Sequence, residues 1–250
     1  MAELRWITAF LDLPADSFDA GTEFWQAVTG SGLSEPRGDR KEFATLVPRD
    51  GDPYLKVQRV EGGSGGIHLD LHTDDVAGYV EHAAGHGATV RQRGDHVVMT
   101  SPGGFTFCVV GHPAGAAVPT PVPWWGGSSI VDQVCLDIPG PLHEIETAFW
   151  ARLTGWEHTA GRFPEFSSLE RPDGQPIRLL LQRLDSDDGP VRAHLDLSST
   201  DPIAEVVRHR SLGAAHVHEH PRWTVLRDPA GLAYCVTERD PTTGTLPPLS

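Results

Sequence analysis

Residues 24–30, FWQAVTG, decide the fold, because the same pattern returns 125 positions later as residues 149–155, FWARLTG. Other stretches repeat in the same order. EFATL at 42–46 returns as EFSSL at 165–169, and HLDL at 68–71 returns unchanged at 194–197. A repeat of this length is typical of a duplicated structural unit. The chain therefore carries two copies of one plan.

The segment between the copies has the composition of a linker. Residues 113–128, PAGAAVPTPVPWWGGS, contain many Pro and Gly and no Asp, Glu, Lys or Arg. Such segments act as semi-rigid spacers. We therefore predict a first domain over 1–112, a linker over 113–128, a second domain over 129–240 and a tail over 241–250.

Composition limits the possible partners. The 250 residues include 20 Lys plus Arg against 34 Asp plus Glu, a net charge of -14, which disfavours nucleic acid and membrane surfaces as partners. The first residues, MAELRWITAFLDLP, lack a signal-peptide pattern, so we expect a cytoplasmic protein. The 3 Cys include no CxxC pair and predict no disulfide framework. We expect a monomer with a pseudo-twofold repeat, or a homodimer, that takes a small organic ligand.

Within each copy, strand and helix periodicity alternate regularly. The first copy predicts strands over 6–13, 42–47, 54–60, 66–72, 88–93, 96–100 and 105–110, and helices over 16–29 and 75–86. Asp16 is the expected N-cap of the first helix and Gly30 its end, and Asp201-Pro202 is the expected helix start in the second copy. The pattern predicts an α+β fold in which each half contains two similar strand-helix-strands units, four in all.

These elements resemble the vicinal oxygen chelate superfamily, the group of glyoxalases, bleomycin-resistance proteins and extradiol dioxygenases. The resemblance rests on the Phe-Trp helix ending in Thr-Gly, the His-led strand and the closing Pro-x-Gly turn, and it covers both halves. It implies four βαβββ units that form cupped mixed sheets. It also implies that metal-dependent members place one ligand on each of four cup strands.

The metal-ligand positions of that superfamily are only partly kept in this chain. His68 and His194 match the His of the second unit's first strand, whereas Cys108 and Cys235 stand where a Glu is usual. The remaining two positions fall near Thr8 and Gln58 in one half and near Gln133 and Gln182 in the other. One His with neutral side chains and a thiol is a poor set for a catalytic divalent ion. We therefore predict no metal cofactor, the alternative being a divalent metal ion held by His68 or His194.

Strand alternation predicts which side chains share the cups with these histidines. The predicted ligand-binding residues are Phe10, Tyr54, Gln58, His68, Asp70, Cys108, Gln133, Gln182, His194, Asp196 and Cys235. By analogy with metal-free members, these residues predict binding of a small organic molecule, as in sequestration of a natural product or drug. The alternative is a lyase, isomerase or oxygenase in which His68 or His194 acts as general base or metal ligand. A third possibility is an interaction protein with vestigial cups.

Structural explanations compete with several of these roles. His68 and His194 can instead be buried residues that hold the sheet together, and the cysteines can be small buried hydrophobes instead of reactive thiols. His216, His218 and His220 alternate along one strand, a spacing that can hold a metal, although a solvated edge strand explains them better. Trp124-Trp125 can anchor the linker or plug the mouth of a cup.

Overall fold

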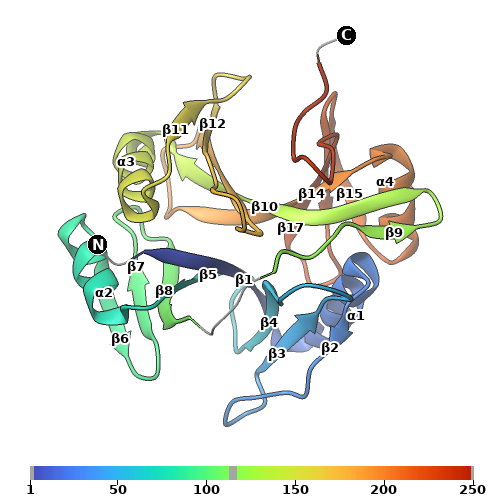
Figure 1. The fold of residues 1–250 in the computed structure, drawn as a ribbon. Coiled ribbons are helices and arrows are strands. Elements are labelled where there is room, and N and C mark those ends of the chain that lie inside the picture. The colour runs from blue at the N-terminus through green and yellow to red at the C-terminus, as the bar shows by residue number, and fades with distance from the viewer. Residues whose placement is uncertain (1–2, 113–116, 249–250) are drawn as a thin grey trace. The chain divides into compact units, whose positions relative to one another are not determined.

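A computed structural model describes residues 3–112 and 117–248. Residues 113–116 of the predicted linker and the end of the predicted tail, 249–250, lie outside the described residues. The described residues form four α-helices and seventeen strands, and Figure 1 shows their order along the chain by colour. No helix in the described part of the chain has the length and hydropathy needed to span a bilayer.

The first half contains two successive βαβββ motifs, as predicted. The first motif has β1 (Leu4–Pro14), η1 (Ala15–Ser17), α1 (Phe18–Thr29), β2 (Gly32–Leu33), β3 (Phe43–Val47) and β4 (Leu55–Val60). The second motif has β5 (Gly66–Thr73), α2 (Val76–Gly85), β6 (Thr89–Arg93), β7 (Val97–Thr100) and β8 (Thr106–Gly111). The two-residue strand β2 was not predicted, because it is too short to show alternation.

The second half repeats this order. Its first motif has β10 (Gly127–Pro139), η2 (Gly140–Leu142), α3 (His143–Thr154), β11 (His158–Ala160), β12 (Phe166–Leu169) and β13 (Arg178–Leu184). Its second motif has β14 (Arg192–Ser199), α4 (Pro202–Ser211), β15 (Ala215–His220), β16 (Trp223–Arg227) and β17 (Ala233–Thr237). The end of the predicted linker forms a further strand, β9 (Val122–Trp124), which pairs with β10.

Each half forms one open mixed sheet, so the predicted α+β class with two cupped sheets is confirmed. The strand order is β2-β3-β4-β1-β5-β8-β7-β6 in the first half and β11-β12-β13-β10-β14-β17-β16-β15 in the second. The first strand of each second motif runs parallel to that motif's last strand, β5 to β8 and β14 to β17. This parallel pair carries the clusters described below.

Two of the three predicted helix boundaries are confirmed and one is wrong. Gly30 ends α1 in the left-handed region at φ 60°, and the Asp201 side chain accepts a hydrogen bond from the backbone N–H of Ala204 at 3.0 Å, which caps α4. Asp16 does not cap α1. It lies inside the short 3₁₀ turn η1, and the N-cap is Ser17, which makes no side-chain capping bond.

The contacts of the chain group into two compact units, and each unit takes one motif from each half. Unit 1 comprises residues 3–10, 67–112 and 134–193, and unit 2 comprises 11–66, 117–133 and 194–248. Unit 1 therefore holds α2 and α3, and unit 2 holds α1 and α4 (Figure 1). A helix from one half thus packs with a sheet region from the other half inside the same unit.

Aromatic packing shows this exchange in both units. In unit 1 the rings of Phe149 and Trp150 on α3 lie 5.9 and 5.6 Å from the ring of Phe107 on β8. In unit 2 the ring of Trp25 on α1 lies 5.1 Å from that of Tyr234 on β17. The Phe-Trp pairs that reveal the repeat are therefore core residues, because each fills the space between a helix and the strands of the other half.

Candidate functional site

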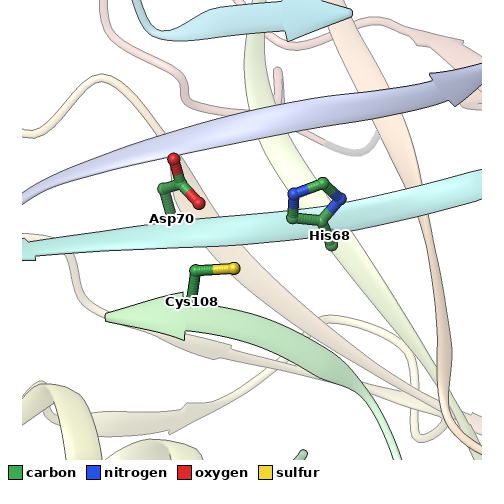
Figure 2. Close-up of side chains that lie close together, drawn as sticks. All are labelled: His68, Asp70 and Cys108. Atoms are coloured by element: carbon green, nitrogen blue, oxygen red, sulfur yellow. The ribbon is translucent and has the colours of Figure 1, made fainter. Parts of the chain in front are cut away.

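Three possible metal ligands converge in unit 1, and we call them the unit 1 cluster: His68, Asp70 and Cys108. His68 and Asp70 are two residues apart on β5, so they lie on one strand face. Cys108 on β8 is the register partner of Asp70 in the parallel pair. One donor atom from each residue lies within 4.8 Å of the other two. Figure 2 shows the three side chains on their adjacent strands.

The unit 1 cluster is buried and its imidazole is held in place. His68, Asp70 and Cys108 are 9%, 7% and 5% exposed. The Phe10 ring on β1 stacks on the His68 ring, with centroids 4.5 Å apart and planes 12° apart. Four of the predicted ligand-binding residues therefore lie together, and the stacked ring restricts the orientation of the imidazole.

Thr8 and His72 form a separate contact farther along the same strands. Thr8 Oγ1 lies 2.9 Å from His72 Nε2, in a buried hydrogen bond. The His72 ring also meets the ring of His112 edge-on, at 6.2 Å. Thr8 was the predicted counterpart of the first metal ligand. Its hydroxyl bonds to His72.

The repeat places an equivalent set in unit 2, the unit 2 cluster: His194, Asp196 and Cys235. Their donor atoms also lie within 4.8 Å of one another, and Asp196 and Cys235 are register partners on β14 and β17. His194 Nε2 lies 3.3 Å from Asp196 Oδ1. Gln133 on β10 donates a hydrogen bond from Nε2 to Asp196 Oδ2. Gln133 therefore satisfies Oδ2 of this carboxylate by a hydrogen bond, whereas Oδ1 lies at ion-pair distance from His194.

Electrostatics in the unit 2 cluster favour a charged carboxylate and a neutral thiol. Burial alone would raise the pKa of Asp196, but the charges of His194 and Arg239 and the Gln133 hydrogen bond hold that pKa below its ordinary value. Burial raises the pKa of the Cys235 thiol. A protonated buried thiol is a poor nucleophile. The cysteines are free and buried, as the structural explanation predicted.

A second buried ion pair lies next to the unit 2 cluster, and sequence reasoning missed it. Arg239 donates to Asp132 Oδ1, and Ser198 Oγ donates to the same oxygen at 2.7 Å. Asp132 alternates with Gln133 along β10, so it lies on the face predicted to be covered by helices. The sequence signal that could have revealed this ion pair is Asp132 itself, a charged residue on an otherwise apolar strand face. Because the charged groups of Arg239 and Asp132 are both buried, removal of either one would leave the other charge unpaired and destabilise the fold.

The remaining predicted residues lie in other contacts. Tyr54 donates a hydrogen bond from its hydroxyl to the backbone carbonyl of Val131 at 2.8 Å, within unit 2. Gln182 Oε1 lies 3.8 Å from Cys135 Sγ, which donates to it, within unit 1. Gln58 lies on β4 as the register partner of Phe43. These three residues are ordered parts of strands whose ligand-binding role stays a prediction.

The histidines of β15 lie on an edge strand, as predicted. β15 ends the nine-stranded sheet, and the register shifts between His216 and His218. The His220 ring stacks on Trp223, with centroids 3.5 Å apart. The shift breaks the simple alternation that would align the three imidazoles on one face. In the described residues these histidines do not form one of the groups of close metal ligands.

The donors of the unit 1 cluster fit a divalent transition metal. Imidazole, carboxylate and thiolate are all ligands of Zn²⁺, and catalytic zinc sites use three protein ligands with one position left for water or substrate. A thiolate favours zinc over the harder manganese ion. The expectation of no metal rested on the superfamily's four ligand positions, which do not include Asp70, although strand alternation places Asp70 beside His68. The alternative of a divalent ion therefore fits this cluster better.

Comparisons with known proteins agree with the fold. A family profile described as "Glyoxalase-like domain" matches residues 8–110 and 133–237. The Mn(II)-bound glyoxalase from Novosphingobium aromaticivorans is 16% identical with a TM-score of 0.64, covering 99% of this chain and 87% of that one. A catechol 2,3-dioxygenase is 14% identical with a TM-score of 0.61, covering 98% and 92%.

A third solved structure has the same fold. A variant of 4-hydroxymandelate synthase from Streptomyces coelicolor is 14% identical with a TM-score of 0.59, covering 97% of this chain and 94% of that one. No curated protein matches the sequence. At these identities the structural likeness establishes the fold alone.

Proposed function

Because both halves of this chain belong to the glyoxalase-like domain family, within the vicinal oxygen chelate superfamily, we propose that the protein is a metal-dependent lyase or isomerase acting on a small organic molecule. The observation that carries the proposal is the convergence of His68, Asp70 and Cys108 in unit 1. Three different donor types meet there from two adjacent strands. His68, Asp70 and Cys108 are the residues that would hold the ion.

The donor types also support a class of reaction. A bound zinc-class ion would supply a Lewis acid that polarises an oxygen atom of the substrate. Zinc does not change oxidation state, and a thiolate ligand is itself easily oxidised. A lyase or isomerase reaction is therefore favoured over an oxygenase reaction, although a catechol 2,3-dioxygenase is among the structural neighbours.

The protein's own residues contribute burial and orientation. Phe10 fixes the plane of the His68 ring by stacking on it, and a fixed imidazole offers its ring nitrogen in one direction. Asp70 supplies negative charge beside His68 in a buried position, which strengthens binding of a cation. The buried setting excludes most water from the donors. Substrates with two adjacent oxygen atoms suit such a site.

Metal-free sequestration of a natural product or drug is the second candidate, and the unit 2 cluster favours it. There, Asp196 lies at ion-pair distance from His194 and accepts a hydrogen bond from Gln133, so its charge has partners without an ion. Cys235 repeats the loss of the usual Glu seen at Cys108. If both clusters behave like the unit 2 cluster, the protein binds its ligand by hydrogen bonds and stacking alone.

Metal content separates the two candidates. The full chain is purified without an affinity tag or immobilised metal, so that His216, His218 and His220 collect no nickel. It is loaded with Zn²⁺, passed through a desalting column and measured by mass spectrometry. We expect one stoichiometric ion that His68→Ala removes and that the matched variant His194→Ala retains. Equal retention by all three proteins, or no retained ion, would exclude the unit 1 cluster as the metal site.

A spectroscopic test addresses the thiol directly. Co²⁺ bound by a thiolate gives a sulfur-to-metal charge-transfer band in the near ultraviolet. We expect this band in the wild type and in Cys235→Ser, and its loss in Cys108→Ser. If metal is absent but glycopeptide or polyketide compounds raise the melting temperature, the sequestration candidate is supported instead.

A further inference from the structure

Unit 2 contains a cavity that shares no residue with either cluster. Its volume is about 410 Å³, within the range of about 300 to 1,000 Å³ that is usual for small-molecule sites. Its lining comes from the end of α1, the loop after β3, the Pro-rich residues 119–123 and the start of β10. The apolar part of the wall includes Leu46, Leu55, Val122, Ile130 and Leu197.

The Pro-rich segment over the cavity is fastened to the loop after β3 at two points. Asp52 and Ala117 exchange two hydrogen bonds of 2.6 Å, one from each backbone N–H. Asp50 accepts from the backbone N–H of Thr120 at 2.8 Å and from its hydroxyl at 2.5 Å. Gly51, at φ 70°, permits the close approach, because a Cβ there would lie 2.7 Å from the Ala117 carbonyl oxygen. These bonds hold the start of the segment, so Pro119 and Thr120, which line the cavity, are fixed in place.

Arg49 places a positive charge at this cavity. Arg49 and Asp50 both line it. The two hydrogen bonds from Thr120 and, to a smaller extent, the positive charge of Arg49 hold the pKa of Asp50 below its ordinary value, so its carboxylate is charged and both of its oxygens accept from Thr120. Arg49 is exposed and makes no hydrogen bond or ion pair within residues 3–112 and 117–248, and its charge acts on the neighbouring Asp50. A guanidinium beside an apolar wall favours an anion attached to an apolar body.

We propose that this cavity binds a small carboxylic acid with an apolar chain or ring, with the carboxylate on Arg49 and the apolar part against Leu46, Val122 and Leu197. The charge on Arg49 selects an acid over a neutral compound, and the apolar wall selects against small hydrophilic acids. The site is independent of the proposed metal-dependent reaction, since its lining and the unit 1 cluster have no residue in common.

Calorimetric titration of the full chain with octanoate and with octan-1-ol tests the proposal. The two compounds share an apolar chain and differ in charge. We expect saturable octanoate binding that Arg49→Met weakens about tenfold or more, with little change for octan-1-ol. Arg40→Met is the matched control, because Arg40 is an exposed arginine of the same unit that does not line the cavity, and it should leave both affinities unchanged.

Two further variants locate the binding. Val122→Phe places extra volume in the cavity and should weaken both compounds, while His68→Ala should weaken neither. Absence of saturable octanoate binding to the wild type, or equal binding by Arg49→Met, would overturn the proposal. Melting temperatures of all variants, measured by circular dichroism, distinguish weaker binding from unfolding of the variant.

Discussion

The indole nitrogen of Trp25 donates a hydrogen bond of 2.7 Å to Oδ2 of Asp228, which lies 203 residues later in the chain. The equivalent indole of Trp150 donates to Glu146 Oε1 at 2.9 Å, four residues earlier on its own helix. The first half has Gly21 where the second has Glu146, and a Cβ at Gly21 would lie 2.8 Å from the Cβ of Ala230. Both tryptophans therefore bond to a buried carboxylate, but the carboxylate comes from a different segment in each unit.

Replacing Asp228 by Ala should strongly destabilise the protein. Asp228 also accepts hydrogen bonds from the backbone N–H groups of Ala230 at 2.9 Å and Leu232 at 2.8 Å. Three buried donors would lose their acceptor, and we expect the free energy of unfolding to fall by about 3 kcal/mol. Urea unfolding followed by tryptophan fluorescence measures this. Trp25→Phe, which removes one donor and leaves the turn intact, should cost less; a loss from Asp228→Ala below that of Trp25→Phe would contradict the account.

Stability should fall in acid partly through Asp196. Its pKa is lower in the folded protein than its ordinary value, so the folded state binds its proton less readily than the unfolded state. The resulting stabilisation is present above the unfolded pKa and is lost as the pH falls through the folded pKa. Asp196→Asn should therefore show a shallower loss of stability below about pH 5 than the wild type, measured by urea unfolding at a series of pH values.

The matched control for Asp196 is an exposed carboxylate. Asp95 lies at an exposed turn between β6 and β7, and Asp95→Asn should keep the slope of the wild type. A slope for Asp196→Asn as steep as that of the wild type would show that the carboxylate gains nothing from His194, Gln133 and Arg239.

Cys235 should react slowly with alkylating reagents in the folded protein. Burial raises the pKa of its thiol, and the thiolate is the reactive form. We expect alkylation by iodoacetamide at pH 7.5 to be at least about tenfold slower in the native protein than in urea, measured by peptide mass spectrometry. Rapid modification in the native state would instead indicate a thiolate activated by His194, and with it a nucleophilic role.

Arg208 should be a major stabilising residue of unit 2. Its guanidinium donates to the carbonyls of Ala27 and Val28, at 3.1 and 3.0 Å, at the end of α1, and to the buried Glu205 at 2.6 Å. Arg208→Met would leave the Glu205 carboxylate with one fewer cation in a buried site, and we expect a loss of about 3 kcal/mol in unfolding free energy. Chemical unfolding of the single variant measures it.

Unit 1 provides the control for that variant. There the neutral hydroxyl of Tyr79 donates a hydrogen bond of 2.9 Å to the carbonyl of Leu153 at the end of α3. Tyr79→Phe removes one hydrogen bond and leaves no ion unpaired, so it should cost only about 1 kcal/mol. Similar losses for Tyr79→Phe and Arg208→Met would mean that the buried charge carries no special penalty.

Most of the fold could be predicted from the repeat, because local sequence patterns determine the helices and strands of each copy. Phe18, Phe24, Trp25 and Val28, apolar residues of the predicted helix over 16–29, are all buried in α1. The predicted helix over 75–86 agrees with α2 at Val76–Gly85 within one residue at each end. The missed strand β9 has Pro123 in the middle, and such a strand is tolerated because it pairs on one side only.

The site was only partly predictable, because its contacts join distant segments. Alternation placed His68 and Asp70 on one face, and alternation together with the superfamily resemblance added Cys108; the structure brings these three side chains together. Alternation could not show that Tyr54 bonds to Val131, 77 residues away, or that Gln133 bonds to Asp196. Those contacts depend on strand register and on which segments share a compact unit, and neither is encoded in local periodicity.

The composition of the two units has a consequence for attempts to divide the protein. Each unit is built from one motif of each half, so a gene fragment ending at the predicted linker would encode half of two cores and the whole of neither. Trp25 would be made without Asp228, and Phe107 without Trp150. Two such fragments, expressed separately, should each be insoluble, and expressed together they should recover a native-like complex by fragment complementation.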